Sequence, residues 1–303
     1  MAKWTSVQVG KIDLDTCGAA YLLGVSREDK IEVLRGGQAS EEDLANPNVL
    51  CIEVGGSGRV AEGNFDHHGL GSKGLGSATL QAWQFYCQER GLWSNDHPLS
   101  SLVDYIDRLD RQGPQALGPR QAGLFPTLSD VFAGMLLVTR DPAEQLHAGV
   151  KILREVNARG LTARTRGVYE RMPVEEVEGW FAFAEVKAEN NRQVAKAVEN
   201  AQWGATFSGL KLAWLETDFF GAPGALYGVG AQVVVAYSRH FGPAGVPKFT
   251  IAGNGIKVDA VLAELNAREP GWGGPATGTI IGSPREGSNL TLNEVVEVVT
   301  RLL

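Results

Sequence analysis

Val49-Leu50-Cys51-Ile52-Glu53-Val54-Gly55-Gly56-Ser57-Gly58 is a continuous apolar run that closes in glycines. A run of this length predicts a strand that is buried on both faces of a sheet, as the strands of parallel sheets are. Glu53 is the charged exception within it. The stretch therefore favours an α/β fold and places a carboxylate near the end of a buried strand.

The chain continues into Asn64-Phe65-Asp66-His67-His68-Gly69, where a second strand would end. A carboxylate followed by two imidazoles offers ligands to a metal ion. Because successive side chains of an extended chain point to opposite sides, one histidine can ligate while the other orients a substrate or a second ligand. On composition alone, an ordinary surface loop fits this segment equally well.

A first strand is predicted over residues 4–9, where β-branched residues alternate with polar ones. Asp13-Leu14-Asp15 follows, and Thr16 is expected to cap a helix that begins at Cys17. The two carboxylates would then lie on a loop between a strand and a helix. Ligands of open α/β sheets bind at that edge.

Strands alternate with helices through this region, which predicts a doubly wound, mostly parallel sheet. A helix is expected over 102–111, with Asp107 and Asp110 three residues apart and hence on one face. Further helices are expected from Pro142 and over about 185–202, and a Gly, Pro and Gln-rich loop or flap over 113–126.

The last third of the chain has new strand signals over 210–215, 232–237 and 248–252, and a capping box at Thr291 and Glu294 begins a final helix. We predict a catalytic metal-binding domain over 1–184, a connector helix over 185–205 and a smaller α+β substrate-binding domain over 206–303. A cleft between the two domains is expected to receive the substrate.

Composition limits the kind of partner. The chain has 303 residues, with 28 Lys and Arg against 35 Asp and Glu, so its net charge of -7 argues against binding to long duplex nucleic acid. The three cysteines lack CxxC spacing and fit reduced thiols. Since neither a signal sequence nor a membrane-spanning run is seen, we expect a cytoplasmic protein with no membrane partner.

Three acidic sites are expected to converge on the Asp66-His67-His68 segment: Asp13 with Asp15, Glu53, and Asp107 with Asp110. Carboxylate oxygens mixed with an imidazole nitrogen suit manganese, and magnesium or iron less well. Two such ions a few ångströms apart would clamp a phosphoryl group and activate water.

These motifs, in this order, resemble the Asp-His-His (DHH) phosphoesterase superfamily, which includes RecJ-type exonucleases, oligoribonucleases, cyclic-dinucleotide phosphodiesterases, family II pyrophosphatases and exopolyphosphatases. The resemblance extends to Pro270-Gly271-Trp272-Gly273-Gly274 and Gly278, which look like the substrate-binding segment of that family's C-terminal domain. It implies a manganese-dependent hydrolase or nuclease that acts on a short oligonucleotide or small nucleotide.

The resemblance also implies roles for individual residues. Asp66, His67 and His68 would be catalytic, with Asp66 bridging the metals. The metal ligands would be Asp13, Asp15, Glu53, Asp66, His67 and Asp107, with Asp110 as the alternative to Asp107. The substrate-binding residues would be Gly273, Gly274, Arg239 and Arg285, because glycine exposes its N–H groups to phosphate and guanidinium binds phosphate in a bidentate manner.

The chain departs from the family pattern at Val9, where a metal-ligating histidine is usual, at Glu53, where an aspartate is usual, and at Pro275, where many members have histidine. A protein that binds metal or nucleotide without catalysis is therefore one alternative. An exopolyphosphatase or pyrophosphatase is another. A base-stacking aromatic residue, either Trp272 or Tyr237, would favour nucleotides, and a homodimer is also allowed.

Overall fold

The computed structural model describes residues 4–34, 38–68, 74–92, 97–113, 126–161, 174–242, 245–274 and 277–303, without the side chains of 174–177. The chain divides into two compact units, Met1–Lys187 and Ala188–Leu303. The division falls inside one long helix, α7 (Val174–Glu199). Most of the loop expected over 113–126, and Pro275, lie outside the described residues.

The first unit is an α/β structure with a parallel sheet. Its elements are β1 (Ser6–Val9), α1 (Leu14–Leu23), β2 (Ile31–Val33), α2 (Glu41–Leu44), β3 (Val49–Ile52), a 3-10 turn (Val60–Glu62), β4 (Asn64–Phe65), α3 (Ala78–Arg90), α4 (Ser100–Gln112), α5 (Leu128–Val138) and α6 (Pro142–Ala158). The strand order is β2-β1-β3-β4, and all neighbours pair in parallel. The predicted fold class is confirmed by this sheet.

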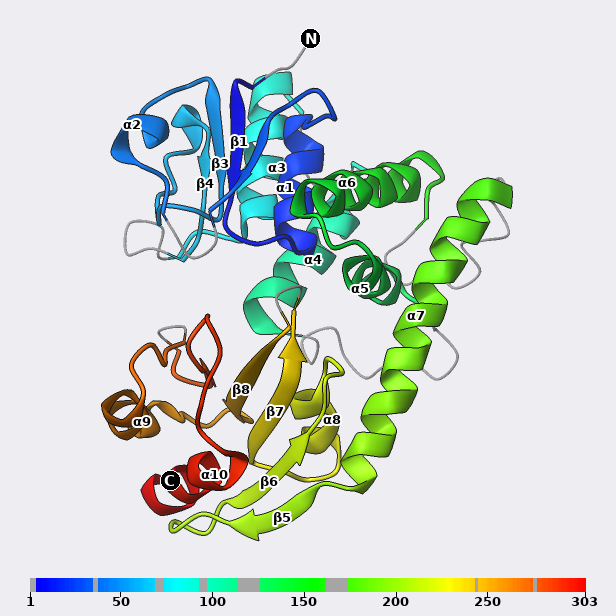
Figure 1. Ribbon diagram of the computed structural model, residues 1–303. Helices are drawn as coiled ribbons and strands as arrows, with labels where there is room; N and C mark the ends of the chain where they lie inside the picture. Colours follow the sequence, from blue (N-terminus) through cyan, green and yellow to red (C-terminus); the bar gives the residue numbers. More distant parts are fainter. Residues whose placement is uncertain are drawn as a thin grey trace. The chain divides into compact units, whose positions relative to one another are not determined.

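Helices lie on both faces of this sheet, α1 and α3 on one and α2 on the other (Figure 1). Leu50 and Ile52 of β3 pack into the larger core beneath α1 and α3, whereas Val49 and Cys51 pack beside Leu44 of α2. All four β3 residues are therefore buried, as the apolar run predicts.

Helix α1 begins earlier than the sequence suggested. Its N-cap is Asp13, whose side chain accepts a hydrogen bond from Thr16 N–H, so the prediction of Thr16 as the cap is wrong. An aspartate caps as well as a threonine does, and the cap shifts by one turn. As a result Asp15 lies within the first helical turn and is buried, instead of lying on the preceding loop.

Gly18 brings α1 and α3 into close contact. A Cβ at this position would lie 2.2 Å from Thr79 Oγ1 and 3.2 Å from Ile106 Cδ1. We expect Gly18→Ala to lower the free energy of unfolding by about 1–3 kcal/mol, because overpacking outweighs the helix propensity gained. Urea unfolding measures the change.

Gly179 of α7 provides the matched control, since a Cβ there meets no atom of the described residues within 4 Å. Gly179→Ala is expected to be neutral or to stabilise by up to about 1 kcal/mol. Equal effects of the two substitutions would contradict the packing explanation.

The second unit contains a mixed sheet in the order β5-β6-β7-β8-β9, in which only β6 and β7 pair in parallel. Its elements are β5 (Gln202–Ala205), β6 (Lys211–Glu216), α8 (Ala222–Gly228), β7 (Val233–Phe241), β8 (Val246–Gly253), a 3-10 turn (Asp259–Val261), α9 (Leu262–Arg268), β9 (Ile280–Gly282) and α10 (Leu292–Leu302).

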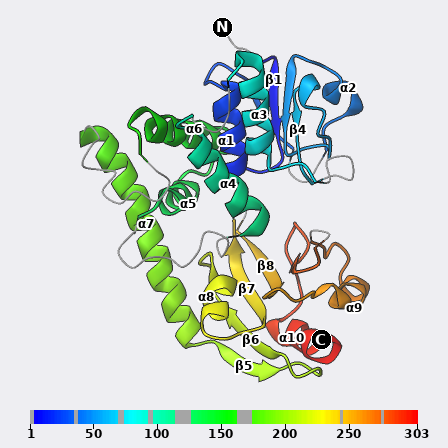
Figure 2. The same ribbon diagram turned by 180° about the vertical axis from the view of Figure 1, so that it is seen from behind.

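Alternate residues of β7 pack into two hydrophobic cores, one on each face of the sheet. Val233 and Val235 pack with α9 and α10, whereas Val234 packs with α8 and the end of α7. The helices accordingly lie on opposite faces of the sheet in both views (Figures 1 and 2). The predicted capping box of Thr291 and Glu294 is present at the start of α10. Within the described residues, every helix is too short or too polar to cross a membrane.

Candidate metal centre

The topology of the first sheet places a switch point at the carboxyl ends of β1 and β3. From β1 the chain proceeds to β2 on one side, and from β3 it proceeds to β4 on the other, so the loops after these strands diverge. Such a switch point is where open α/β sheets bind ligands. Gly10 lets the two loops approach, because a Cβ there would lie 2.6 Å from Glu53 O.

Four side chains from four segments converge at this switch point. Their members are Asp15 of α1, Glu53 after β3, His67 after β4 and Asp110 of α4, with one ligating atom of each within 4.8 Å of the others. His67 Nε2 lies 3.0 Å from Asp110 Oδ2, 3.6 Å from Glu53 Oε1 and 3.9 Å from Asp15 Oδ2. A second group of Glu53, His67 and His68 overlaps the first.

The ligating atoms of this cluster are poorly satisfied by the protein itself. Glu53 Oε1, His67 Nε2 and Asp110 Oδ2 are buried, and the described residues provide none of these atoms with a well-directed hydrogen bond. Buried polar atoms normally make well-directed hydrogen bonds, so three that converge without them suit a shared ligand such as a cation. Oxygen and nitrogen donors of this kind fit a divalent cation such as manganese or magnesium.

Asp15 is positioned by the start of α3. Its two carboxylate oxygens accept hydrogen bonds from the backbone N–H groups of Ala78 and Thr79, at 2.9 and 2.8 Å. Burial, followed by the charges of Glu53 and Asp110, nevertheless raises the pKa of Asp15 to about 7. The carboxylate is therefore held in place but gains a proton readily when no cation is near.

Glu53 is held in an uncommon backbone conformation. Its φ of 55° is the only positive value of a non-glycine residue among those the structure describes. Such backbone strain is tolerated where surrounding contacts enforce it and often occurs at functional sites. Thr16 Oγ1 donates a 2.5 Å hydrogen bond to Glu53 Oε2, which leaves Oε1 facing the cluster.

Asp66 organises the neighbouring loop. Its Oδ2 accepts from Gly56 N–H at 2.8 Å, and its Oδ1 accepts from His68 N–H at 2.9 Å and contacts His68 Nδ1 at 3.1 Å. Burial opposes ionisation, but these contacts lower the pKa of Asp66. Asp66 thus borders the four-residue cluster and orients His68, whose ring is half exposed.

His67 carries a strong affinity for a proton in this setting. Burial lowers its pKa, but the carboxylates of Asp110 and Glu53 outweigh that effect and raise the pKa to about 10. The imidazolium then partly neutralises the surrounding carboxylates. A metal ion at the same point would have to displace this proton.

Asp107 and Asp110 have different roles. Asp107 Oδ1 accepts from Ser77 N–H at 2.8 Å, and the carboxylate pairs with Arg111 through two hydrogen bonds. The structure therefore does not bring Asp107 into the cluster, where we expected it as a ligand. Asp110, the alternative, occupies that place.

Asp13 also lies outside the four-residue cluster. Its carboxylate pairs with Lys11, a residue that we did not predict to belong to the site. Lys11 Nζ lies 2.8 Å from Asp13 Oδ2 and 3.4 Å from Glu53 Oε1, so its ammonium bridges the two carboxylates. The only sequence signal was a cation two residues before the first aspartate. Lys11 adds positive charge at one end of the site.

The predicted phosphate ligands of the second unit are engaged in other contacts. Gly273 N–H donates to Gly282 O of β9, and a Cβ at Gly274 would lie 2.0 Å from Ile280 O, so Gly274 permits a close approach to β9. Arg239 pairs with Glu216, and Arg285 is exposed.

Of the two aromatic residues expected to stack on a base, Trp272 is buried in the core and Tyr237 packs against that core while partly exposed. Trp272 is 5% exposed and stacks on Phe249, as Tyr237 also does. Their rings are therefore occupied by protein contacts.

Searches against models of known families and against curated proteins find no match to this chain. Among solved structures, the DHH domain of a member of a ribosomal protein family is 15% identical, covers 98% of this chain and 86% of its own, and has a TM-score of 0.42. An uncharacterized protein from Helicobacter pylori G27 is 13% identical, covers 98% of this chain and 99% of its own, and has a TM-score of 0.33.

Proposed function

We propose that this chain is a divalent-metal-dependent phosphoesterase whose metal is held by Asp15, Glu53, His67 and Asp110. The observation that carries the proposal is the convergence of these ligating groups, three of them with an unsatisfied buried atom, at the switch point of a parallel sheet. The motif order of the DHH superfamily supports it as well. Manganese is the expected ion and magnesium the alternative, because the ligands are carboxylates and an imidazole.

The expected reaction is hydrolysis of a phosphate ester in a short oligonucleotide or small nucleotide. A bound divalent cation supplies a Lewis acid for the phosphoryl group and makes water nucleophilic at neutral pH. The buried carboxylates of Asp15, Glu53 and Asp110 hold the charge that attracts the cation.

His68 is suited to proton transfer. Its Nδ1 contacts Asp66, so Nε2 is the nitrogen that remains for a substrate, and the Asp66 contact raises the pKa of His68. A protonated, half-exposed imidazole beside the cluster can donate a proton to the leaving oxygen. Asp66 acts on this step by fixing the orientation of the ring.

Two alternatives retain the same cluster. An exopolyphosphatase or pyrophosphatase would differ only in its substrate. A protein that binds metal or nucleotide without catalysis is favoured by one observation, the ammonium of Lys11 beside Glu53 and Asp13, which competes with a second cation for these carboxylates.

Manganese titration and hydrolysis assays test the proposal on the full chain, with short RNA, cyclic dinucleotides, adenosine bisphosphate and pyrophosphate as substrates. We expect manganese binding and manganese-dependent release of nucleotide or phosphate. His68→Ala is expected to keep manganese binding and to lower the turnover rate by about 100- to 10,000-fold, the usual contribution of a general acid. Asp104→Ala, on the exposed side of α4, is the control and should change neither manganese binding nor the turnover rate.

The outcomes separate the candidate functions. Turnover of pyrophosphate alone would change the substrate class, and metal binding without turnover of any substrate would favour the non-catalytic protein. A chain that binds neither manganese nor magnesium would overturn the proposal.

A further inference from the structure

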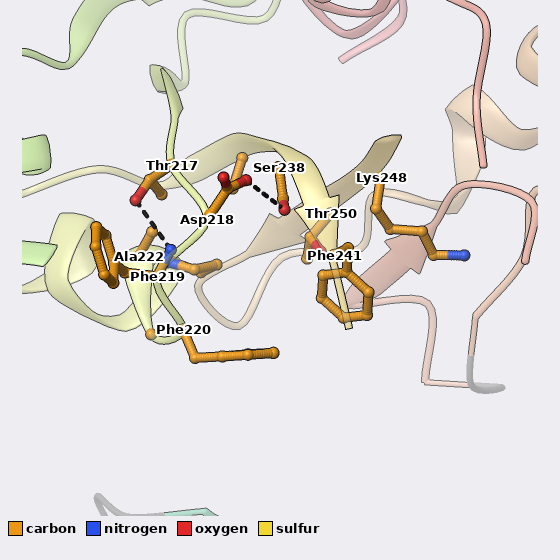
Figure 3. A pocket seen from close by; sticks show the side chains of 12 residues that line it. Thr217, Asp218, Phe219, Phe220, Ala222, Ser238, Phe241, Lys248 and Thr250 are labelled. Carbon is orange, nitrogen blue, oxygen red and sulfur yellow. Dashed lines mark hydrogen bonds between the residues drawn. The ribbon is translucent and has the colours of Figure 1, made fainter. Parts of the chain in front are cut away.

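The second unit contains a cavity of about 250 Å³ that lies far along the sequence from the metal ligands. Figure 3 shows its lining, to which the loop between β6 and α8, the start of α8, β7 and β8 contribute. The side chains that the inference uses are Asp218, Phe219, Phe220, Ser238, Phe241 and Lys248. At roughly 30 Å³ per water molecule, this volume holds about eight waters, or a single ring system.

The cavity lies where the topology of the second sheet favours a ligand. Strands β6 and β7 are its parallel pair, and Thr217 and Asp218 follow β6 directly, whereas Phe241 ends β7. The carboxyl ends of neighbouring parallel strands, with a helix as their connection, form the usual binding edge of an α/β sheet.

Three phenylalanine residues line this cavity while remaining accessible to solvent. Phe219, Phe220 and Phe241 are 42%, 48% and 36% exposed, and the rings of Phe220 and Phe241 lie 5.4 Å apart at 59°. Exposed aromatic residues that gather at one place mark an interaction site. Sequence-tolerant nucleic-acid binding uses such rings as stacking platforms.

Asp218 gives the cavity a negative edge. Burial opposes its charge, but hydrogen bonds from His240 and Ser238 outweigh that and lower the pKa of Asp218 to about 2. An ionised carboxylate repels phosphate and other anions. Asp218 Oδ1 accepts hydrogen bonds from Ser238 Oγ and His240 N–H, whereas Oδ2 contacts only His240 Nδ1 and can accept a further N–H. A single carboxylate is a poor site for a metal ion, which binds several oxygen ligands.

The positive charge of Lys248 does not make the cavity attractive to anions. Its Nζ donates at 2.7 Å to the carbonyl oxygens of Ser283 and Pro284, and Figure 3 shows the nitrogen directed away from the three rings. Its alkyl stem lines the cavity instead. The ligand that fits is therefore uncharged and planar, with N–H groups at its edge.

We propose that this cavity binds a nucleobase, which stacks on the phenylalanine rings while an N–H group at its edge donates to Asp218. The inference goes beyond the proposed function, because the cavity lies in the second unit and requires no metal ion. It assigns ring recognition to Phe219, Phe220 and Phe241 in place of Trp272 and Tyr237.

Calorimetric titration of the full chain with adenosine, guanosine, cytidine and uridine tests the proposal. We expect at least one nucleoside to bind with Kd on the order of 0.1–1 mM, as suits a ligand of this size. Inorganic phosphate should not compete. Phe220→Ala is expected to weaken binding about 5- to 100-fold, the usual effect of losing a stacking ring.

Two further variants isolate the ring. Phe220→Leu retains apolar volume without a stacking face and should weaken binding nearly as much, whereas Phe220→Tyr should retain it. Phe207→Ala is the control, because Phe207 is 90% exposed in the same unit but does not line the cavity.

Failure of all four nucleosides to bind, or binding that Phe220→Ala leaves unchanged, would overturn the proposal. Nucleoside binding that persists in Asp110→Asn would separate this cavity from the metal centre. Conversely, manganese-dependent hydrolysis without nucleoside binding would leave the proposed function standing and remove only the nucleobase site.

Discussion

Asp110→Asn is expected to weaken manganese binding by at least about 100-fold, whereas Asp107→Asn should leave the affinity nearly unchanged. Asp110 Oδ2 is buried and lies 3.0 Å from His67 Nε2, so a cation that displaces the His67 proton gains this carboxylate as a ligand. Even residues that only support metal ligands contribute about 10- to 100-fold to affinity, and a ligand contributes more. Isothermal titration with manganese measures both variants.

Asp107→Asn makes a matched control because it removes the same charge from the same helix. The carboxylate of Asp107 holds Arg111 and the Ser77 N–H group. We therefore expect a loss of about 1–3 kcal/mol in the free energy of unfolding, with metal affinity preserved. If Asp107→Asn abolished binding and Asp110→Asn did not, the assignment of the ligand would be wrong.

The sequence predicts the first sheet well because its signal is local. The apolar run over 49–54 became β3 (Val49–Ile52), since a strand covered on both faces has to be apolar throughout. Glu53 follows directly, at the carboxyl end of the strand. Its position at the switch point then depends only on the parallel pairing of β3 with β1.

The choice between Asp107 and Asp110 could not be made from the sequence. Both lie on one face of α4, and the decisive partner of Asp107 is the N–H group of Ser77, thirty residues earlier in the chain. Arg111, four residues after Asp107, was a weak local signal of a helical ion pair. Lys11 was missed for the same reason, because its contact with Glu53 depends on how β1 and β3 pair.

The glycine pair at 273 and 274 shows a different limit. We predicted that both glycines expose their N–H groups to phosphate. The sequence does not show that β9 lies beside them, where a Cβ at Gly274 would meet Ile280 O. The aromatic residues illustrate the same limit, since burial distinguishes Trp272 in the core from Phe220 at the cavity.

Manganese binding is expected to strengthen as the pH rises. A metal ligand must be deprotonated, and the metal-free pKa of His67 is raised to about 10 by Asp110 and Glu53 against the effect of burial. Between about pH 7 and pH 9, one proton then leaves for each ion bound, so the affinity should increase about tenfold per pH unit. Titration in buffers of different ionisation enthalpy counts that proton directly.

Asp15 should make the dependence steeper below pH 7. Burial and the charges of Glu53 and Asp110 raise the pKa of Asp15 to about 7, so a second proton has to leave below that value. The affinity is then expected to change up to about 100-fold per pH unit at pH 5–6. Asp15→Asn should remove this steeper segment and leave the part due to His67, whereas His147→Gln on α6 should alter neither. An affinity that stays constant from pH 6 to pH 9 would show that the ion binds without displacing the His67 proton, and would place it outside the cluster.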